Sequence, residues 1–154
     1  GIKIKYNREF IMEPTGRPLI VHKQFNTNVG ILKLFPGITH DYVKHILNTP
    51  GIKGLIMETF GSGNAPTSDW FLDELADAIK KGLIIYNVTQ CKSGSVEMGR
   101  YETSLDLTNI GVISGYDITT ESALAKMMYL LGSQMSRRDI KRYLQTPLRG
   151  EMTV

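Results

Sequence analysis

The sequence predicts a three-layer α/β domain, in which helices cover both faces of a mainly parallel, four-stranded sheet. Short apolar runs alternate along the chain with stretches whose apolar residues recur at helical spacing. The run 83–88 is apolar on both faces for most of its length, which is typical of a buried parallel strand. Because crossovers between parallel strands are right-handed, this alternation indicates a Rossmann- or flavodoxin-like sandwich.

Each predicted element is bounded by residues that start or stop regular structure. The strands are expected at 29–35, 54–60, 83–88 and 111–114. The helices begin after residues that cap N-termini and end near Gly, Pro or Lys. These capping residues are expected to be Thr39, Thr67 or Ser68, and Thr119 or Thr120. The remaining two helices are expected at 104–109 and 136–144.

The first 28 residues differ from the rest. They contain two short alternating pieces, 2–5 and 19–22, which flank the turn-forming stretch 13–18. We therefore expect residues 1–28 to be an interdomain linker or hairpin and residues 29–154 to form the domain. The chain opens at Gly1 without an initiator methionine, so we also expect it to be a piece of a longer protein.

Composition places the chain among soluble globular domains. It has 154 residues, of which 42% are hydrophobic and 21% charged, and its net charge of +3 is dispersed. The densest basic stretch, 137–149, is interpreted as a solvated helix face and tail, not a nucleic-acid surface. No apolar run is long enough to span a membrane. A single cysteine, Cys91, excludes an internal disulfide and indicates a reducing compartment.

Candidate binding chemistry lies in the loops after the second and third strands, 58–66 and 89–101. Ligands of parallel sheets bind beyond the carboxyl ends of the strands. The glycines of the first loop allow close approach of the backbone, and the Asn64 amide offers a donor and an acceptor. The loop lacks the signature of a phosphate-binding site. A tight connection with Asn64 as a turn residue therefore stays open as an alternative.

Cys91 places a thiol at the end of the third strand, but none of the three histidines stands at a motif spacing from it. We therefore expect a buried, inert cysteine. His40 and His45 are five residues apart, which is not one helical face, so no metal site is expected. No triad or Ser-Lys signature is present either. From the residues alone, the chain is an α/β domain without a complete catalytic constellation.

Several segments, in order and over nearly the whole chain, resemble type I L-asparaginases. Residues 58–66 are similar to their G-x-G-N-A/G-P segment, and residues 111–126 to their G-V-I-x-G-x-D-M-T-x-E-A-x-x-x-K run. Residues 148–153 are similar to their closing L-R-G-E-M/L-T. The segments 19–22, 35–38 and 89–96 also fit. The chain is thus identified as resembling the C-terminal domain of a cytoplasmic type I L-asparaginase.

This resemblance implies a two-domain amidohydrolase that converts L-asparagine and water to L-aspartate and ammonia without a metal or cofactor. The catalytic threonines of the family lie in T-G-G-T and H-G-T-D-T segments of the N-terminal domain, and this chain has neither. The chain alone is therefore expected to be inactive. Its expected partners are the missing N-terminal domain and further copies, as a dimer or tetramer. Asn64 and Tyr101 match residues that complete the active site of a neighbouring subunit.

The resemblance further implies an effector site for L-asparagine, formed in some bacterial members near Glu58, Thr59, Asn64 and Cys91. Glu58 stands where those members have an arginine, and a carboxylate would repel the α-carboxylate of an effector. Two other functions stay open as alternatives. The chain would then be a free-standing amino-acid-binding regulatory module, or a dimerisation domain without catalysis.

Overall fold

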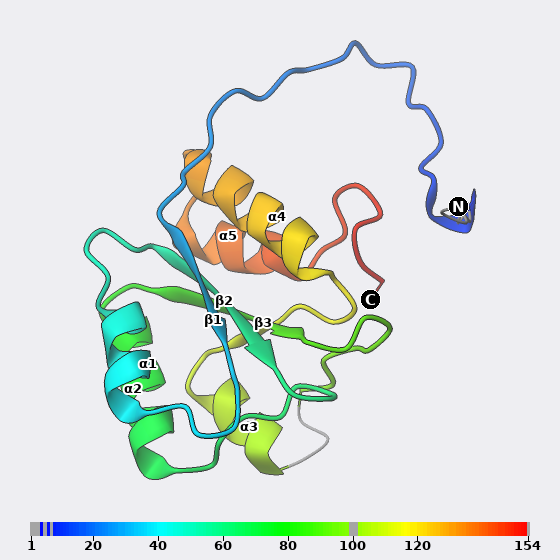
Figure 1. Cartoon of the computed structure of the whole chain (residues 1–154). Helices are drawn as coiled ribbons and strands as arrows, with labels where there is room; N and C mark the ends of the chain where they lie inside the picture. The colour runs from blue at the N-terminus through cyan, green and yellow to red at the C-terminus, as the bar shows by residue number, and fades with distance from the viewer. Residues whose placement is uncertain (1–3, 5, 7, 99–101, 154) are drawn as a thin grey trace.

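The computed structural model describes residues 4, 6, 8–98 and 102–153. These residues form one sheet of four parallel strands between two helical layers (Figure 1). The strands follow the order of the chain: β1 (Val29–Lys33), β2 (Gly54–Thr59), β3 (Ile84–Thr89) and β4 (Ile113–Ser114). The predicted fold class is confirmed, and every strand pair is parallel.

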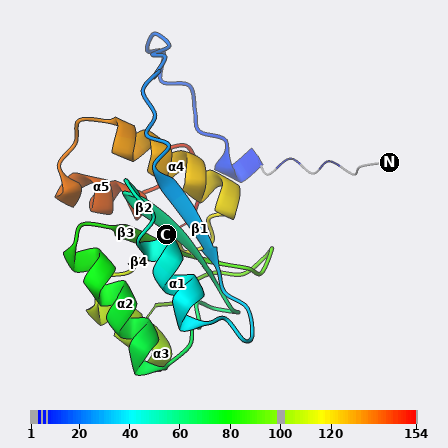
Figure 2. The same cartoon turned by 60° about the vertical axis from the view of Figure 1, so that its left-hand side comes forward.

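Five α-helices connect and cover the described strands. They are α1 (His40–Leu47), α2 (Asp69–Lys80), α3 (Glu102–Asn109), α4 (Thr120–Gly132) and α5 (Arg137–Leu144). Figures 1 and 2 show α1, α2 and α3 on one face of the sheet and α4 and α5 on the other. The crossovers therefore place helices on both faces, as the alternating sequence predicts.

The helix starts follow the predicted capping chemistry. Thr39 accepts a hydrogen bond from the backbone N–H of Tyr42, and Thr119 accepts one from that of Ser122. Each side chain satisfies a backbone donor that has no partner within its helix. Ser68 precedes α2 without such a bond. The caps predicted at Thr39 and Thr119 are confirmed, and Thr119, not Thr120, is the cap of α4.

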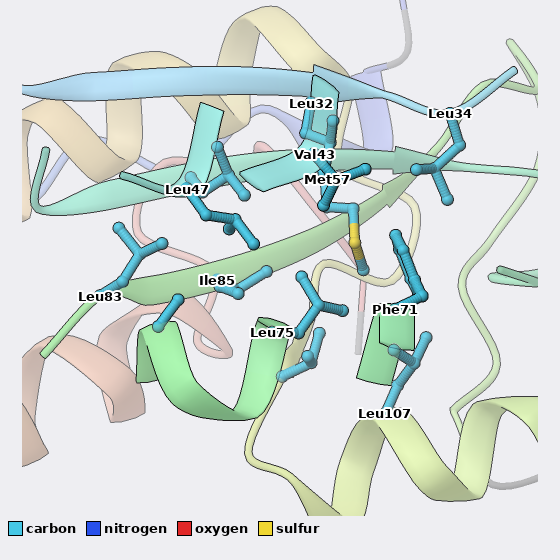
Figure 3. Close-up of a cluster of buried hydrophobic side chains, with 13 residues drawn as sticks. Leu32, Leu34, Val43, Leu47, Met57, Phe71, Leu75, Leu83, Ile85 and Leu107 are labelled. Carbon is cyan, nitrogen blue, oxygen red and sulfur yellow. The ribbon is translucent and has the colours of Figure 1, made fainter. Parts of the chain in front are cut away.

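One face of the sheet carries an apolar core. Leu32, Met57 and Ile85, from three adjacent strands, point toward α1 and α2 (Figure 3). Phe71 of α2 and Leu107 of α3 close this cluster, and all five side chains are fully buried. Because successive residues of a strand point to opposite faces, the neighbours of these strand residues point toward α4.

The opposite face combines apolar packing with buried polar groups. Ile56 and Tyr86 of the sheet pack with Met127 and Leu130 of α4. The Tyr86 hydroxyl donates a hydrogen bond of 2.6 Å to the backbone carbonyl of Leu144, at the end of α5. Burial raises the pKa of Tyr86, so the hydroxyl stays protonated and donates. This bond joins the sheet to the last helix.

The described part of residues 1–28 contains a short 3-10 turn, η1 (Arg8–Phe10), and no strand. Residues 19–22, which would be one strand of the hairpin expected as an alternative, therefore form no strand. Alternation alone does not make a strand when no neighbouring strand supplies backbone partners. Figures 1 and 2 show this segment extending away from the sheet. That it links two domains stays a prediction.

Candidate functional site

The carboxyl ends of β2 and β3 lie side by side and carry the two loops that the sequence singles out. The Gln90 N–H donates to the Thr59 carbonyl at 3.0 Å, and the Glu97 N–H donates to the Ser62 carbonyl at 2.9 Å. The Thr89 hydroxyl donates to the carbonyl of Gly61. These bonds join the loops to each other, so their polar residues share one edge of the sheet, as expected.

The loop that carries Asn64 is a tight, backbone-bonded turn. Phe60 and Asn64 exchange hydrogen bonds between their N–H and carbonyl groups at 2.8 and 2.9 Å. Gly63 has a φ of 109°, and a Cβ there would lie 2.9 Å from the Val96 side chain. A glycine is therefore required at this position. The turn fixes the half-buried Asn64 at the sheet edge, and its role toward a substrate stays a prediction.

The buried side chain of Thr59 links β2 to β3 at the carboxyl end of the sheet. Its side chain is fully buried, and its hydroxyl lies 2.7 Å from the Asn87 Oδ1 and 3.1 Å from the Val88 carbonyl. The Asn87 amide in turn reaches the sulfur of Met98 at 3.5 Å. Sequence reasoning missed Asn87, although a lone polar residue in the apolar run 83–88 was a usable signal.

A cavity of about 440 Å³ opens at the same edge, on the α4 side. Its lining is polar and charged. It consists of Lys33, Glu58, Thr89, Gln90, Cys91, Lys92, Gly94 and the stretch 117–121. The Glu58 carboxylate accepts a 2.6 Å hydrogen bond from the Thr120 hydroxyl and lies 3.5 Å from the Lys33 ammonium. Glu58 therefore lies at the N-terminus of α4, where the helix dipole favours a negative charge.

Cys91 lies at this cavity and is exposed, so the expectation of a buried cysteine is wrong. The physical reason is its position two residues beyond the end of β3, in a turn outside the sheet. Its N–H donates to the Thr89 hydroxyl oxygen at 3.0 Å, and its carbonyl accepts from the Gly94 N–H. The apolar residues 83–88 do not by themselves show at which following residue the chain leaves the core.

The structure brings together only two of the four residues predicted for an effector site. Glu58 and Cys91 line one cavity, whereas Thr59 and Asn64 do not line it. Glu58 and Thr59 are consecutive strand residues, and their side chains point to opposite faces. Tyr101, the other residue predicted to reach a neighbouring subunit, lies outside the described residues. The predicted roles of these residues stay predictions.

The residues described at this edge can bind and orient a ligand. Of their hydroxyls, those of Thr120 and Thr153 donate to the carboxylates of Glu58 and Asp117. The hydroxyls of Thr59 and Thr89 donate to amide or carbonyl oxygens, and neither contacts a side chain that could act as a base. Within the described ranges, no group of three His, Cys, Asp or Glu residues could hold a metal ion. None of the described helices is long and apolar enough to cross a membrane.

A buried ion pair beside this edge was not foreseen from the sequence. The Lys126 ammonium of α4 lies 2.6 Å from the Glu151 carboxylate and donates to the Thr146 carbonyl at 2.8 Å. Burial alone would raise the pKa of Glu151. Hydrogen bonds from Lys126 and from the backbones of Arg149 and Leu148 instead lower it to about 2. Residues 145–153, named here the closing segment, are therefore held against α4.

The closing segment also reaches the cavity wall. Asp117, which lines the cavity, accepts a 2.7 Å hydrogen bond from the Thr153 N–H, and its other oxygen accepts from the Thr153 hydroxyl. The end of the described chain is thus fixed to the same edge as the loops after β2 and β3.

Comparisons with known proteins agree with this arrangement. The glutaminase/asparaginase C-terminal domain family matches residues 28–144. L-asparaginase 1 of Escherichia coli K12 is 42% identical over 135 residues, which are 88% of this chain and 40% of that protein. The human 60 kDa lysophospholipase is 44% identical over 155 residues, which are 99% of this chain and 27% of that protein.

A solved structure shows the same architecture. The crystal structure of L-asparaginase I from Vibrio cholerae superposes with a TM-score of 0.85 at 40% identity, over 93% of this chain and 42% of that one. The chain therefore spans well under half the length of the relatives it matches. It belongs to the glutaminase/asparaginase C-terminal domain family.

Proposed function

We propose that this chain is the C-terminal domain of a type I L-asparaginase, which hydrolyses L-asparagine to L-aspartate and ammonia. The observation that carries the proposal is the continuous match to L-asparaginase 1, at 42% identity over 88% of the chain. The chain lacks the T-G-G-T and H-G-T-D-T segments, so the nucleophile comes from an N-terminal domain. The contribution of this domain is then to binding and orientation.

Asn64 is the residue through which this contribution acts. Its amide can donate to the carboxylate of an amino acid and accept from its ammonium. The turn between Phe60 and Asn64 is closed by two backbone hydrogen bonds, so the side chain is positioned before the substrate arrives. We assign to Asn64, together with Tyr101 from the following loop, the completion of the active site of a neighbouring subunit in a dimer or tetramer.

The cavity at Glu58 does not favour an activating L-asparagine. The carboxylate already bonds to Thr120 and pairs with Lys33 at the N-terminus of α4. An incoming α-carboxylate would meet a like charge at the place where the helix dipole is most attractive. We therefore propose that the rate depends hyperbolically on L-asparagine concentration, and a sigmoidal dependence would contradict this part.

A second candidate function, hydrolysis of lysophospholipids, is suggested by the names of two relatives that match nearly the whole chain. The human and mouse proteins at 44% and 43% identity are named 60 kDa lysophospholipases. Hydrolysis of a lysophospholipid ester needs a nucleophile just as amide hydrolysis does. The chain has neither of the two threonine segments in either case, so the same complementation experiment decides between the two substrates.

The experiment is co-expression of this chain with an upstream domain that carries the two threonine segments. Ammonia release from L-asparagine is expected from the pair and not from the purified chain alone. Turnover by the chain alone would contradict the assignment of the nucleophile. Fatty-acid release from lysophosphatidylcholine without ammonia release would favour the second candidate. Micromolar binding of L-asparagine to the isolated chain in calorimetry would instead support a free-standing amino-acid sensor.

A further inference from the structure

Two polar side chains, Thr59 and Asn87, are fully buried on the sheet face that carries Met57 and Ile85. The Thr59 hydroxyl at the end of β2 lies 2.7 Å from the Asn87 Oδ1 in β3. Replacing both members of a buried hydrogen-bonded pair by apolar groups of the same shape can leave stability nearly unchanged. A gain in stability therefore does not explain why this pair is polar.

The backbone of Asn87 is held from both sides of β3. Asn87 pairs with Met57 of β2 and with Ser114 of β4. Its carbonyl accepts a 2.8 Å hydrogen bond from the Gly115 N–H. A Cβ at Gly115 would lie 2.7 Å from that carbonyl oxygen, so only a glycine allows the approach. The Asn87 side chain therefore projects from a fixed point of the sheet.

The Asn87 amide lies next to both ends of the turn that carries Asn64. One end is Phe60, which directly follows Thr59, and the other is Asn64, which directly follows Gly63. A Cβ at Gly63 would lie 3.5 Å from the Asn87 Nδ2. The residues that precede the two ends of the turn, Thr59 and Gly63, are thus both neighbours of one buried amide.

The same amide reaches the loop after β3. The Asn87 Nδ2 lies 3.5 Å from the sulfur of Met98. The neighbouring Glu97 N–H donates to the Ser62 carbonyl at 2.9 Å, so this loop is bonded to the turn as well. One side chain therefore contacts β2, the turn and the loop at the point where these three segments meet.

We propose that Asn87 is a positioning residue, which fixes the turn 60–64 so that the Asn64 side chain is oriented toward the substrate. This role rests on the proposed function, because the proposed function assigns Asn64 to the substrate. Asn87 is itself fully buried, so it acts through Asn64. The backbone bonds between Phe60 and Asn64 close the turn but leave its tilt relative to the sheet free. Asn87 supplies that restraint through Thr59 and Gly63.

A double-mutant cycle tests this role in the longer enzyme, in which the native upstream sequence precedes this chain. Asn87→Leu removes the amide and keeps the size of the side chain, and the Thr59 hydroxyl retains the Val88 carbonyl at 3.1 Å as an acceptor. We expect kcat/KM for L-asparagine to fall about tenfold or more, because the orientation of Asn64 is lost. In an Asn64→Ala background the same change should lower kcat/KM by less than about twofold, because no side chain is left to orient. An equal loss in both backgrounds, or no loss in either, would overturn the proposal.

Tyr86→Phe is the matched control for a loss of stability alone. Tyr86 is adjacent to Asn87 in β3, is also fully buried, and donates a hydrogen bond to the Leu144 carbonyl on the opposite face of the sheet. This change should lower stability and keep kcat/KM within about twofold in the folded enzyme. A loss of kcat/KM as large as that of Asn87→Leu would show that any weakened buried bond has this effect, and would contradict a specific role of Asn87.

Two variants of Thr59 test the same restraint from its other side. Thr59→Val keeps the shape of the side chain and removes the hydroxyl that holds the amide, whereas Thr59→Ser keeps the hydroxyl. Thr59→Val should reproduce most of the loss seen in Asn87→Leu, and Thr59→Ser should stay within about twofold of the parent enzyme. Equal activity of these two variants would overturn the proposal, also where Asn87→Leu does not fold.

Hydrogen exchange measures the restraint without reference to turnover. The N–H groups of Gly63 and Asn64 donate to the Phe60 carbonyl at 3.0 and 2.8 Å. In the longer enzyme these amides should exchange about tenfold faster in Asn87→Leu and at the parent rate in Tyr86→Phe. Exchange at the parent rate in Asn87→Leu would show that the amide does not hold the turn.

The Asn64→Ala variant separates failure of this role from failure of the proposed function. Full activity of Asn64→Ala would remove the proposed function and the role of Asn87 with it. A loss of about 100-fold in Asn64→Ala, with Asn87→Leu within about twofold of the parent enzyme, would keep the proposed function and remove only the role of Asn87.

Discussion

The closing segment and the segment 11–25 both contact α4, but they are held in opposite ways. The closing segment is fastened by Lys126 and Asp117 through an ion pair and several hydrogen bonds, and Met152 within it is only 4% exposed. The N-terminal segment 11–25 is held mainly near residue 26 and leaves Leu19 90% exposed. The difference indicates that the closing segment completes this domain, whereas residues 11–25 add little to its packing.

The chemistry of the two ends agrees with this difference. Polar bonds hold the closing segment in one position, because buried charges such as Lys126 and Glu151 are tolerated only with matched partners. The N-terminal segment offers apolar side chains, which bind by burial and need no partner of fixed geometry.

The largest effect is expected from Lys126→Met. The change leaves the Glu151 carboxylate, 14% exposed, without its ammonium partner, so unfolding free energy should fall by about 3–5 kcal/mol. Urea denaturation measures this loss. The control is Lys80→Met, which removes an exposed pair with Asp77 and should change stability by less than about 0.5 kcal/mol. Similar losses in both variants would mean that the closing segment is not specifically fastened.

Low pH should weaken the attachment of the closing segment and lower the free energy of unfolding. The pKa of Glu151 is lowered from its ordinary value of 4.5 to about 2, so the carboxylate stabilises the fold above pH 4.5. This contribution, about 3 kcal/mol, is lost as the pH falls from 4.5 toward 2. Denaturation curves between pH 7 and pH 3 measure most of this loss, roughly 2 kcal/mol. Glu151→Gln should be less stable at pH 7 and show a shallower decline, and a parallel decline would contradict the assignment.

A smaller effect is expected where the sheet meets α5. Tyr86→Phe removes the hydroxyl that donates to the Leu144 carbonyl and leaves that acceptor buried without its partner. Stability should fall by about 1–2 kcal/mol. Thermal denaturation of the variant measures the loss. Tyr42→Phe, on the exposed side of α1, is the matched control, and an unchanged melting temperature in Tyr86→Phe would show that the bond contributes nothing.

The smallest effect is expected at the open end. Ile20→Ser changes a side chain that is 73% exposed and should alter the stability of the isolated chain by less than about 0.5 kcal/mol. A loss above 1 kcal/mol in the isolated chain would show that the segment already belongs to this domain's core.

Local signals in the sequence predicted the fold. Apolar periodicity located the strands and helices, and Thr39 and Thr119 act through hydrogen bonds to residues only three positions away. These local signals do not show which charged residues, far apart in the sequence, form ion pairs in the fold. Lys126 and Glu151 are 25 positions apart, and neither residue alone differs from a surface charge. Successive residues of a strand point to opposite faces of the sheet, so the sequence already separates Glu58 from Thr59. The predicted effector site was taken from the family resemblance, which does not use this rule.

The exposure of Cys91 could not be predicted for a related reason. A cysteine that follows a buried strand by two residues can lie in the core or in the loop. Which of the two it occupies depends on where the neighbouring strand ends. The position of Asn64 was predicted better. Two glycines and a proline around it indicate a tight turn, and the structure closes that turn with reciprocal bonds to Phe60.

The central claim of the proposed function is that this domain acts in catalysis by holding Asn64, together with Tyr101, at a neighbouring active site. The most direct test compares Asn64→Ala with Asn48→Ala, at the C-terminus of α1, in the enzyme reconstituted with its upstream domain. The claim predicts that Asn64→Ala lowers kcat/KM for L-asparagine by about 100-fold or more in the folded enzyme, and that Asn48→Ala keeps it within about twofold. Equal activity of the two variants would contradict the claim.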